Sequence, residues 1–91
     1  DNLWKTFLSA RYDMSITDET DLNSILSTGI YSWFTENGYP INMPETHSTR
    51  GLLIVFCYAS HTTQFLSDSD GRLYHRMSVA NGKKFSNWRL L

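Results

Sequence analysis

Apolar residues in the first third of the chain recur every three to four positions, which is the spacing of one face of a helix. The first such stripe consists of Leu3, Trp4, Phe7 and Leu8. Asn2 is a candidate N-cap in front of it. A second stripe, at positions 22, 25 and 26, follows the largely acidic run 18–21, and Gly29 would end it. The pattern predicts one short helix over 3–11 and another that ends before Gly29.

The middle of the chain predicts two strands separated by a long loop. Residues 30–34 carry the β-branched and aromatic side chains that strands favour. Residues 35–50 are mostly polar and contain both prolines, so we expect a loop there. The run 52–58 is the most apolar part of the chain and is apolar on both faces. It therefore predicts a central strand that is covered on both sides.

The last third of the chain predicts a three-stranded antiparallel meander. Asp70-Gly71 and Asn81-Gly82 are strong hairpin signals. They separate strands over 63–67, 72–79 and 83–90. The predicted fold class is thus α+β and strand-rich, with short N-terminal helices followed by a mainly antiparallel sheet and the C-terminal meander.

Two-residue turns in this meander would place Phe65 opposite Arg76 and His75 opposite Trp88. Because side chains alternate along a strand, this register sorts them onto two faces. The core face would carry Gln64, Leu66, Leu73, His75, Met77, Val79, Trp88 and Leu90. The other face would carry Phe65, Tyr74, Arg76, Ser78, Phe85, Asn87 and Arg89. The second set is aromatic and arginine-rich, which suits a binding or subunit surface.

Composition narrows the class of protein. The 91 residues are enough for one domain, and eight Lys and Arg stand against nine Asp and Glu. A protein that binds nucleic acid or docks on anionic membranes would carry a basic excess, so we expect neither. No apolar stretch approaches the about 20 residues of a membrane span, so we expect no membrane insertion.

Cys57 is the one cysteine, so the chain has no internal disulfide. Its position in the most apolar run predicts a buried, inert thiol. The chain begins with Asp1 rather than Met and ends just past Trp88. We therefore expect a fragment of a longer protein, whose neighbouring parts carry some of the function.

Residues with catalytic or metal-binding chemistry are scattered. His47, His61 and His75 lack partners at metal-ligand spacing. Asp68 and Asp70 resemble part of a calcium loop, but its closing Glu is missing. We expect no catalytic residues, no metal and no cofactor. A small enzyme with His75 as base is the weakest alternative, because the predicted register places no carboxylate beside it.

Arg76 is the most informative polar residue, because it lies in the middle of a predicted strand. A covered strand arginine needs a carboxylate or carbonyl partner. We expect a structural pairing, with Asp21 as the favoured partner. Direct contact with a ligand is the alternative.

Several short pieces of the chain, taken in order, resemble the pyocin-knob family. They are Asp21-Leu22-Asn23, Gly29-Ile30-Tyr31, Asn42, Pro44, 51–55, Thr63-Gln64, Tyr74 with Arg76, and 85–88. The resemblance covers 18–91 and leaves 1–17 as a separate helical or stalk-linking segment. Its structural signature is Asp21, Asn23, Gly29, Tyr31, Gln64, Arg76 and Trp88.

The resemblance implies a module without activity of its own in a homotrimeric bacteriophage tail fibre or tailspike, or in a phage-tail-like bacteriocin. Such a module belongs to the virion or particle and lies near the receptor-binding part, outside the cell. We expect identical chains as partners and a bacterial surface polysaccharide as a further one. The alternative is an accessory glycan-binding domain of a tailspike depolymerase whose catalytic part lies elsewhere.

Aromatic side chains exceed what a core of this size needs, and they suit surfaces that meet a partner. The candidates for ligand or subunit contact are Trp33, Tyr39, Phe65, Tyr74, Phe85 and Arg89. Two partners could cover them, namely symmetry-related copies or a saccharide, and the copies are favoured because a trimer keeps them close.

Overall fold

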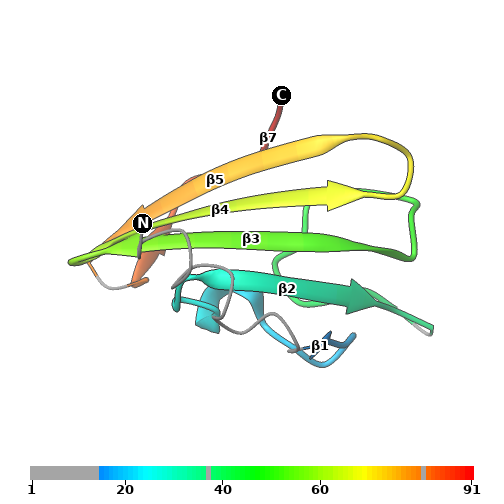
Figure 1. Ribbon diagram of the computed structural model, residues 1–91, viewed down its shortest axis with the longest axis horizontal. Helices are drawn as coiled ribbons and strands as arrows, with labels where there is room; N and C mark the ends of the chain where they lie inside the picture. The colour runs from blue at the N-terminus through cyan, green and yellow to red at the C-terminus, as the bar shows by residue number, and fades with distance from the viewer. Residues whose placement is uncertain (1–14, 37, 81) are drawn as a thin grey trace, which may run out of the picture.

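Seven strands form one sheet in the computed structural model, which describes residues 15–36, 38–80 and 82–91 (Figure 1). In chain order they are β1 (Ser15–Ile16), β2 (Gly29–Phe34), β3 (Arg50–Tyr58), β4 (His61–Asp68), β5 (Leu73–Val79), β6 (Lys84–Phe85) and β7 (Arg89–Leu90). β1 and β2 are parallel, and every other pair is antiparallel. The order across the sheet runs from β1 to β6, and β7 also pairs with β5. The prediction of a strand-rich, mainly antiparallel sheet is confirmed.

Helical structure in the described residues is limited to one 3-10 turn, Leu22–Ser24. Asp21 caps its start and Ile25 its end, and the Gln64 side chain of β4 binds the carbonyls there. The Gln64 Nε2 donates to the carbonyl of the first residue of the turn at 2.8 Å and to that of Ile25 at 2.9 Å. A longer α-helix would have used these oxygens itself. The prediction of a second short helix is therefore wrong, and the helix predicted over 3–11 lies outside the described residues.

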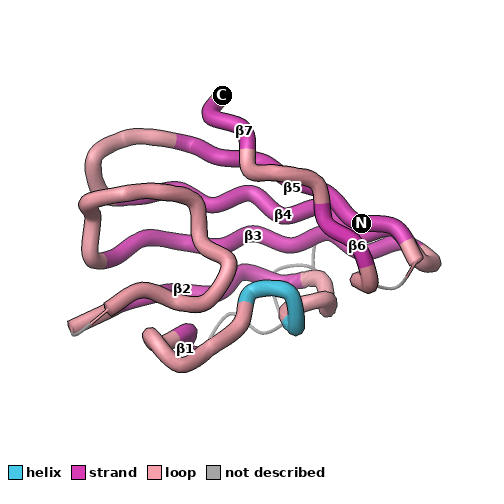
Figure 2. Tube along the Cα trace, turned by 180° about the vertical axis from the view of Figure 1, so that it is seen from behind, coloured by secondary structure: helices cyan, strands magenta, loops and turns pink. Residues whose placement is uncertain are grey.

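The core lies on one face of the sheet. Its buried apolar side chains are Ile16, Leu22, Tyr31, Trp33, Leu53, Val55, Leu66 and Tyr74. The segment between β1 and β2 and the loop between β2 and β3 lie over this face, which we call the covered face (Figure 2). The two segments are joined by backbone hydrogen bonds from Ile41 to Thr20 and from Leu22 to Ile41. The predicted polar loop is present and supplies most of the second layer.

β3 is central, as predicted, but it is covered on one side. Leu53 and Val55 have no exposed surface, whereas Leu52 is 44% and Phe56 49% exposed. Both covering segments lie on the Leu53 side, so the expectation of cover on both sides is wrong for the described part of the chain. Cys57 is exposed near the end of the strand, and the prediction of a buried thiol is wrong as well.

The hairpin between β4 and β5 forms at the predicted signal with a longer turn. Gln64 pairs with Arg76 and Phe65 with His75, one residue away from the predicted register. The turn contains one extra residue because Asp68 pairs with Arg72 through a backbone hydrogen bond of 3.1 Å. The slip turns β5 over relative to the prediction. Tyr74, Arg76 and Ser78 are buried, whereas Leu73 and Val79 are exposed.

The third strand of the meander is split into two short strands. β6 keeps the predicted register with β5, whereas β7 pairs Arg89 with His75. Between them, the Ser86 N donates to the carbonyl of Met77 at 2.8 Å, and the Ser86 Oγ accepts from the Met77 N at 3.0 Å. The Ser86 hydroxyl thus accepts the hydrogen bond that a backbone carbonyl would accept in a regular strand pair. The regular backbone pairing with β5 is interrupted at this residue. The predicted pairing of His75 with Trp88 is wrong, but Trp88 does pack against the core.

Candidate functional site

Two of the six surface candidates, Trp33 and Tyr74, belong to the core, where 2% and 8% of their surface is exposed. The Trp33 Nε1 donates to the carbonyl of Ser67 at 3.2 Å, across the intervening strand β3. Its ring lies against Gly51, where an added Cβ would come within 2.7 Å of Nε1. The Tyr74 Oη donates to the carbonyl of Glu45 at 3.1 Å. Both side chains are therefore used inside the molecule.

The other four candidates are divided between the two sides of the sheet. Tyr39 is exposed on the covering loop. Phe65 lies on the opposite side, with its ring centroid 4.9 Å from that of His75. Phe85 contacts Arg76 on the covered side, and Arg89 is exposed on β7. The six candidates thus form no single surface. The one-residue slip separates Phe65 from Tyr74 and Phe85, whereas Trp33 is buried by the covering segments independently of the slip.

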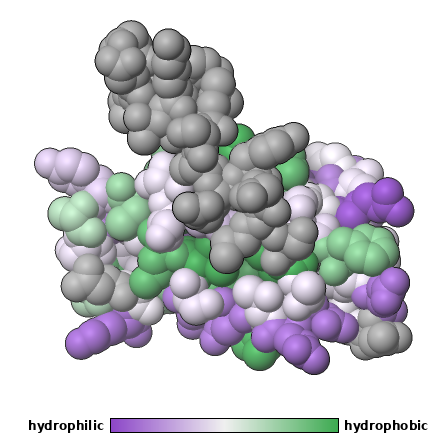
Figure 3. Space-filling model, turned by 60° about the horizontal axis from the view of Figure 1, so that its bottom comes forward, coloured by the Kyte–Doolittle hydropathy of each residue, from purple (hydrophilic) through white to green (hydrophobic). Residues whose placement is uncertain are grey.

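In the described part of the chain, the side of the sheet opposite the covering loops carries no covering segment and many apolar side chains. We call it the uncovered face, and its apolar side chains are Phe34, Leu52, Ile54, Phe56, Phe65, Leu73, Met77 and Val79. Phe34, Leu52, Leu73 and Val79 are between 39% and 51% exposed. Hydrophobic surface also occupies the middle of the molecule when it is seen from the β1–β2 side, with polar side chains along the lower edge (Figure 3). Exposed apolar side chains in this number make the face a candidate interaction surface.

Several of the structural signature residues lie on the covered face. Gln64 has no exposed surface, and its Oε1 accepts a hydrogen bond of 2.8 Å from the Arg76 Nε. Its amide nitrogen holds the end of the 3-10 turn, so one side chain joins β4, β5 and the segment before β2. Tyr31 of β2 is also buried, and its Oη donates to the carbonyl of Ser27 at 2.7 Å. Gly29 is buried at the start of the same strand.

Arg76 is buried, and two aromatic rings lie against its guanidinium. Its guanidinium carbon lies 3.9 Å from the centroid of the Phe85 ring and 4.6 Å from that of Trp88. Burial lowers the pKa of Arg76 to about 10, and the charge of Asp21 opposes this effect. The group therefore stays charged at neutral pH. Stacking on aromatic faces is a favourable environment for a guanidinium that has lost its water.

Asp21 does not form the predicted ion pair with Arg76. Among the described residues the salt bridge found joins Arg72 and Asp70, 3.6 Å apart at the surface. The expected carbonyl contact of Arg76 is present, because its partner is the amide oxygen of Gln64. The Asp21 Oδ1 instead accepts from the Asn42 Nδ2 at 2.7 Å and from the Asn23 N at 2.9 Å. These two hydrogen bonds hold the pKa of Asp21 below its usual value, and the more distant charge of Arg76 adds to them.

A polar pocket of about 260 Å³ opens beside the stacked guanidinium. Its walls are formed by Asn23, Asn42, Met43, Arg76, Phe85, Ser86, Asn87 and Trp88. The Trp88 Nε1 donates to the carbonyl of Asn42 at 2.8 Å and so fixes one wall to the covering loop. Sequence reasoning missed Asn42, Ser86 and Asn87 as wall residues. The run 85–88 is one of the pieces that carry the resemblance. The sequence does not show, however, that the strand breaks at Ser86 and that this break turns the run towards Arg76.

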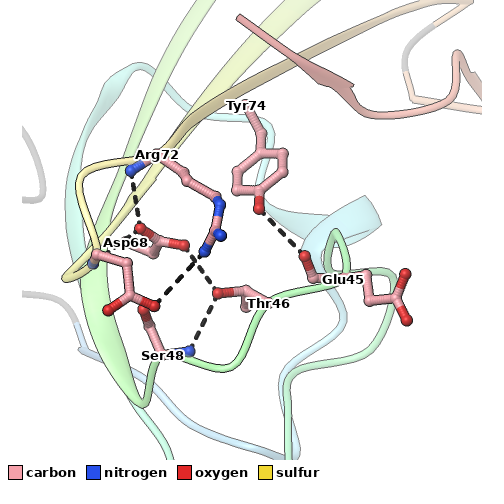
Figure 4. Close-up of polar contacts among 7 residues, drawn as sticks. Glu45, Thr46, Ser48, Asp68, Arg72 and Tyr74 are labelled. Atoms are coloured by element: carbon pink, nitrogen blue, oxygen red, sulfur yellow. Dashed lines mark hydrogen bonds and ion pairs between the residues drawn. The ribbon is translucent and has the colours of Figure 1, made fainter.

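The turn between β4 and β5 is held by a second polar network, centred on Asp68 (Figure 4). The Asp68 Oδ1 accepts from the backbone N–H groups of Asp70 and Arg72 at 3.0 and 2.9 Å, and its Oδ2 accepts from the Thr46 Oγ1 at 2.8 Å. Thr46 also accepts from the Ser48 N at 3.1 Å. Burial raises the pKa of Asp68, but these hydrogen bonds outweigh it and hold the pKa below its usual 3.8. The network fastens the covering loop to the sheet.

Metal-binding chemistry is not assembled in the described part of the chain, where no three side chains of the ligand types His, Cys, Asp and Glu come together. Asp68 belongs to the loop that resembles part of a calcium site. Its carboxylate oxygens already accept hydrogen bonds from N–H and O–H donors of the chain. Residues 15–36, 38–80 and 82–91 also contain no helix with the length and hydropathy of a membrane span.

Comparison with known proteins gives a likeness of fold. No protein-family model matches the chain, and no curated protein matches it either. A solved structure of the P. aeruginosa R1 pyocin fibre, comprising its C-terminal residues 323–701, is similar to this chain with a TM-score of 0.67 and 24% sequence identity. The similarity covers 96% of this chain and 23% of the fibre chain. This chain therefore shares its fold with a part of a pyocin fibre and spans about a quarter of that fragment's length.

Proposed function

We propose that this chain is a non-catalytic structural module of a trimeric bacteriophage tail fibre or tailspike, or of the fibre of a phage-tail-like particle. The observation that carries the proposal is the one-sided sheet. Loops of the same chain close the covered face, while the uncovered face is apolar and exposed. The similarity of fold to a part of the R1 pyocin fibre supports this assignment.

Identical chains are the partners that the uncovered face would take. A domain of 91 residues without a disulfide has a modest core, so contacts between copies add a substantial part of its stability. Phe34, Leu52 and Val79 are 51%, 44% and 50% exposed. Burying their remaining apolar surface in a three-fold contact would stabilise the assembly by roughly 25 cal/mol for each Å² removed from water.

The covered side would then stay accessible at the outside of the trimer and contact bacterial surface saccharide. The pocket beside Arg76 supports this part of the proposal, because three asparagine side chains and one hydroxyl line it. The same pocket favours a second candidate function, an accessory glycan-binding domain of a tailspike depolymerase whose catalytic part lies elsewhere. In either case the module acts outside the cell, on the particle.

Sedimentation equilibrium of the chain, alone and fused to a three-stranded coiled coil, tests the trimer. Leu52→Glu places a charge on the uncovered face, so we expect it to abolish association while leaving the fold intact, because Leu52 is already 44% exposed. Ile41→Glu is the matched control, since Ile41 is 52% exposed on the covering loop. Equal loss of association in both variants would contradict the proposal. So would a fused chain whose unfolding temperature is no higher than that of the isolated chain.

A further inference from the structure

Two residues that line the pocket beside Arg76 each carry a buried polar atom, and the two atoms are of opposite character. The Arg76 Nη2 is a donor without an acceptor among the described residues, and the Asn23 Oδ1 is an acceptor without a donor. Both residues line the same pocket. Leaving such atoms unpaired inside a protein is unfavourable, and folded proteins avoid it in most places. A ligand with both an acceptor and a donor would satisfy the two atoms.

The charge of the pocket specifies the acceptor. Arg76 is 4% exposed and keeps a positive charge, yet none of the described carboxylates lies within ion-pair distance of it. The Phe85 and Trp88 rings lie against its guanidinium, and Gln64 occupies its Nε. Only the terminal nitrogens are left for a partner. A carboxylate is the acceptor that matches a guanidinium edge in both charge and geometry.

The remaining walls specify the rest of the ligand. The side chains of Asn23, Asn42, Ser86 and Asn87 bring amide and hydroxyl groups around the guanidinium. Groups of this kind recognise hydroxyls, which both donate and accept. A volume of about 260 Å³ is below the range of drug-sized sites and suits one ring rather than an extended chain.

We infer that this pocket is a subsite for an acidic sugar, whose carboxylate binds Arg76 and whose hydroxyls bind the surrounding asparagines. The inference deepens the proposed saccharide contact and rests on it. Because the Arg76 Nη2 is itself buried, entry of the carboxylate requires a pocket side chain to turn aside. Asn87 is suited to this, because it is exposed and lies in the break between β6 and β7.

The test is a titration of the chain with glucuronate, glucose and acetate, followed by the ¹H–¹⁵N signal of the Trp88 indole N–H. This group lies in the pocket wall and donates to Asn42, so it reports occupancy directly. We expect saturable shifts with glucuronate, and affinities at least about tenfold weaker for glucose and for acetate. Equal binding of glucose would overturn the role of the carboxylate. Equal binding of acetate, or no shift with any probe, would overturn the sugar subsite.

Variants separate recognition from folding. Arg76→Lys keeps the charge but loses the fork geometry, and we expect glucuronate affinity to fall about tenfold or more. Asn87→Asp leaves Arg76 in place and adds a negative charge at an exposed wall position, so we expect a similar loss in a chain with unchanged thermal unfolding. Arg72→Lys is the control, because Arg72 is an exposed arginine in the β4–β5 turn. Full affinity in Asn87→Asp, or an equal loss in Arg72→Lys, would contradict the subsite.

The sugar subsite and the trimer are separate hypotheses, and each can be contradicted without the other. The pocket lies on the covered side and the proposed subunit contact on the uncovered face. A chain that associates but gives no Trp88 shift would overturn the sugar subsite alone. A chain that binds glucuronate but neither associates alone nor gains stability in the fusion would overturn the trimer alone.

Discussion

Gln64 and Arg76 lie opposite each other on β4 and β5 and are joined by a hydrogen bond of 2.8 Å from the Arg76 Nε to the Gln64 Oε1. The Gln64 amide nitrogen at the same time binds the carbonyls of Leu22 and Ile25. A single buried side chain therefore satisfies three partners from two other segments. Removing it leaves the buried charge of Arg76 and the Ile25 carbonyl without this partner, whereas the Leu22 carbonyl still accepts from the Ile25 N at 3.2 Å.

Gln64→Met keeps the length of the side chain and removes all three hydrogen bonds. We expect it to lower the free energy of unfolding by about 2–4 kcal/mol, measured by urea denaturation. Thr63→Ala is the control on the uncovered side of the same strand, where a change within about 0.5 kcal/mol is expected. A Gln64→Met chain as stable as the control would show that the hydrogen bonds to Gln64 contribute little.

Asp68→Asn should destabilise the chain by about 1–2 kcal/mol at pH 7, because an amide cannot accept all three hydrogen bonds that the carboxylate accepts. The pKa of Asp68 is lower in the folded chain than its usual 3.8. The stabilisation it provides is thus complete above that value and is lost as the pH falls through the lower folded pKa.

The difference in melting temperature between the wild-type chain and Asp68→Asn should therefore shrink below pH 3.8. Asp70→Asn is the matched control, since the Asp70 side chain is 52% exposed and its salt bridge lies at the surface. It should cost little at any pH. A difference for Asp68→Asn that stays constant down to acid pH would contradict the role of the charged carboxylate.

Strands and turn positions could be predicted because their signals are local. The alternating side chains of 30–34, the apolar run 52–58 and the two glycine turns each lie within a few residues of the structure they specify. The signature residues came from the resemblance to the pyocin-knob family, because no local pattern of polar and apolar positions marks glycine, tyrosine and tryptophan together with Gln64 and Arg76.

The register and the second helix depend on contacts between distant residues. The turn after β4 gains a residue because the carboxylate of Asp68 binds the N–H groups of Asp70 and Arg72, which no dipeptide signal encodes. The helix is shortened by Gln64, a residue 42 positions away from Leu22. The pocket could not be predicted for the same reason. It requires Ser86 to break the strand and turn Trp88 towards Arg76.

Gly51→Ala should be strongly destabilising, although Gly51 lies in a regular strand. An added Cβ would approach the carbonyl oxygen of Ser67 to 2.0 Å and the Trp33 Nε1 to 2.7 Å. Neither a backbone carbonyl nor a buried indole can move without disturbing the sheet, so we expect a loss of about 1–3 kcal/mol or more. Gly38→Ala is the matched control, because nothing lies within 4 Å of the added methyl. Equal thermal unfolding of the two variants would contradict the packing of Trp33 over Gly51.

Trp88 links the stability of the covered face to the pocket, and two substitutions separate its contributions. Trp88→Ala removes the ring that lies 4.6 Å from the Arg76 guanidinium carbon and the hydrogen bond to Asn42. A fully buried Trp replaced by Ala costs about 3–5 kcal/mol. Trp88 is only partly buried, so we expect about 2–3 kcal/mol.

Trp88→Phe retains a stacked ring and loses only the hydrogen bond, and we expect a cost of about 1 kcal/mol. Chemical denaturation of the three chains measures both values. If the Phe variant were as unstable as the Ala variant, the hydrogen bond to Asn42 rather than the stacking on Arg76 would hold Trp88 in place. If neither variant moved the denaturation midpoint, Trp88 would contribute nothing to the core, and its packing against Arg76 would be without energetic consequence.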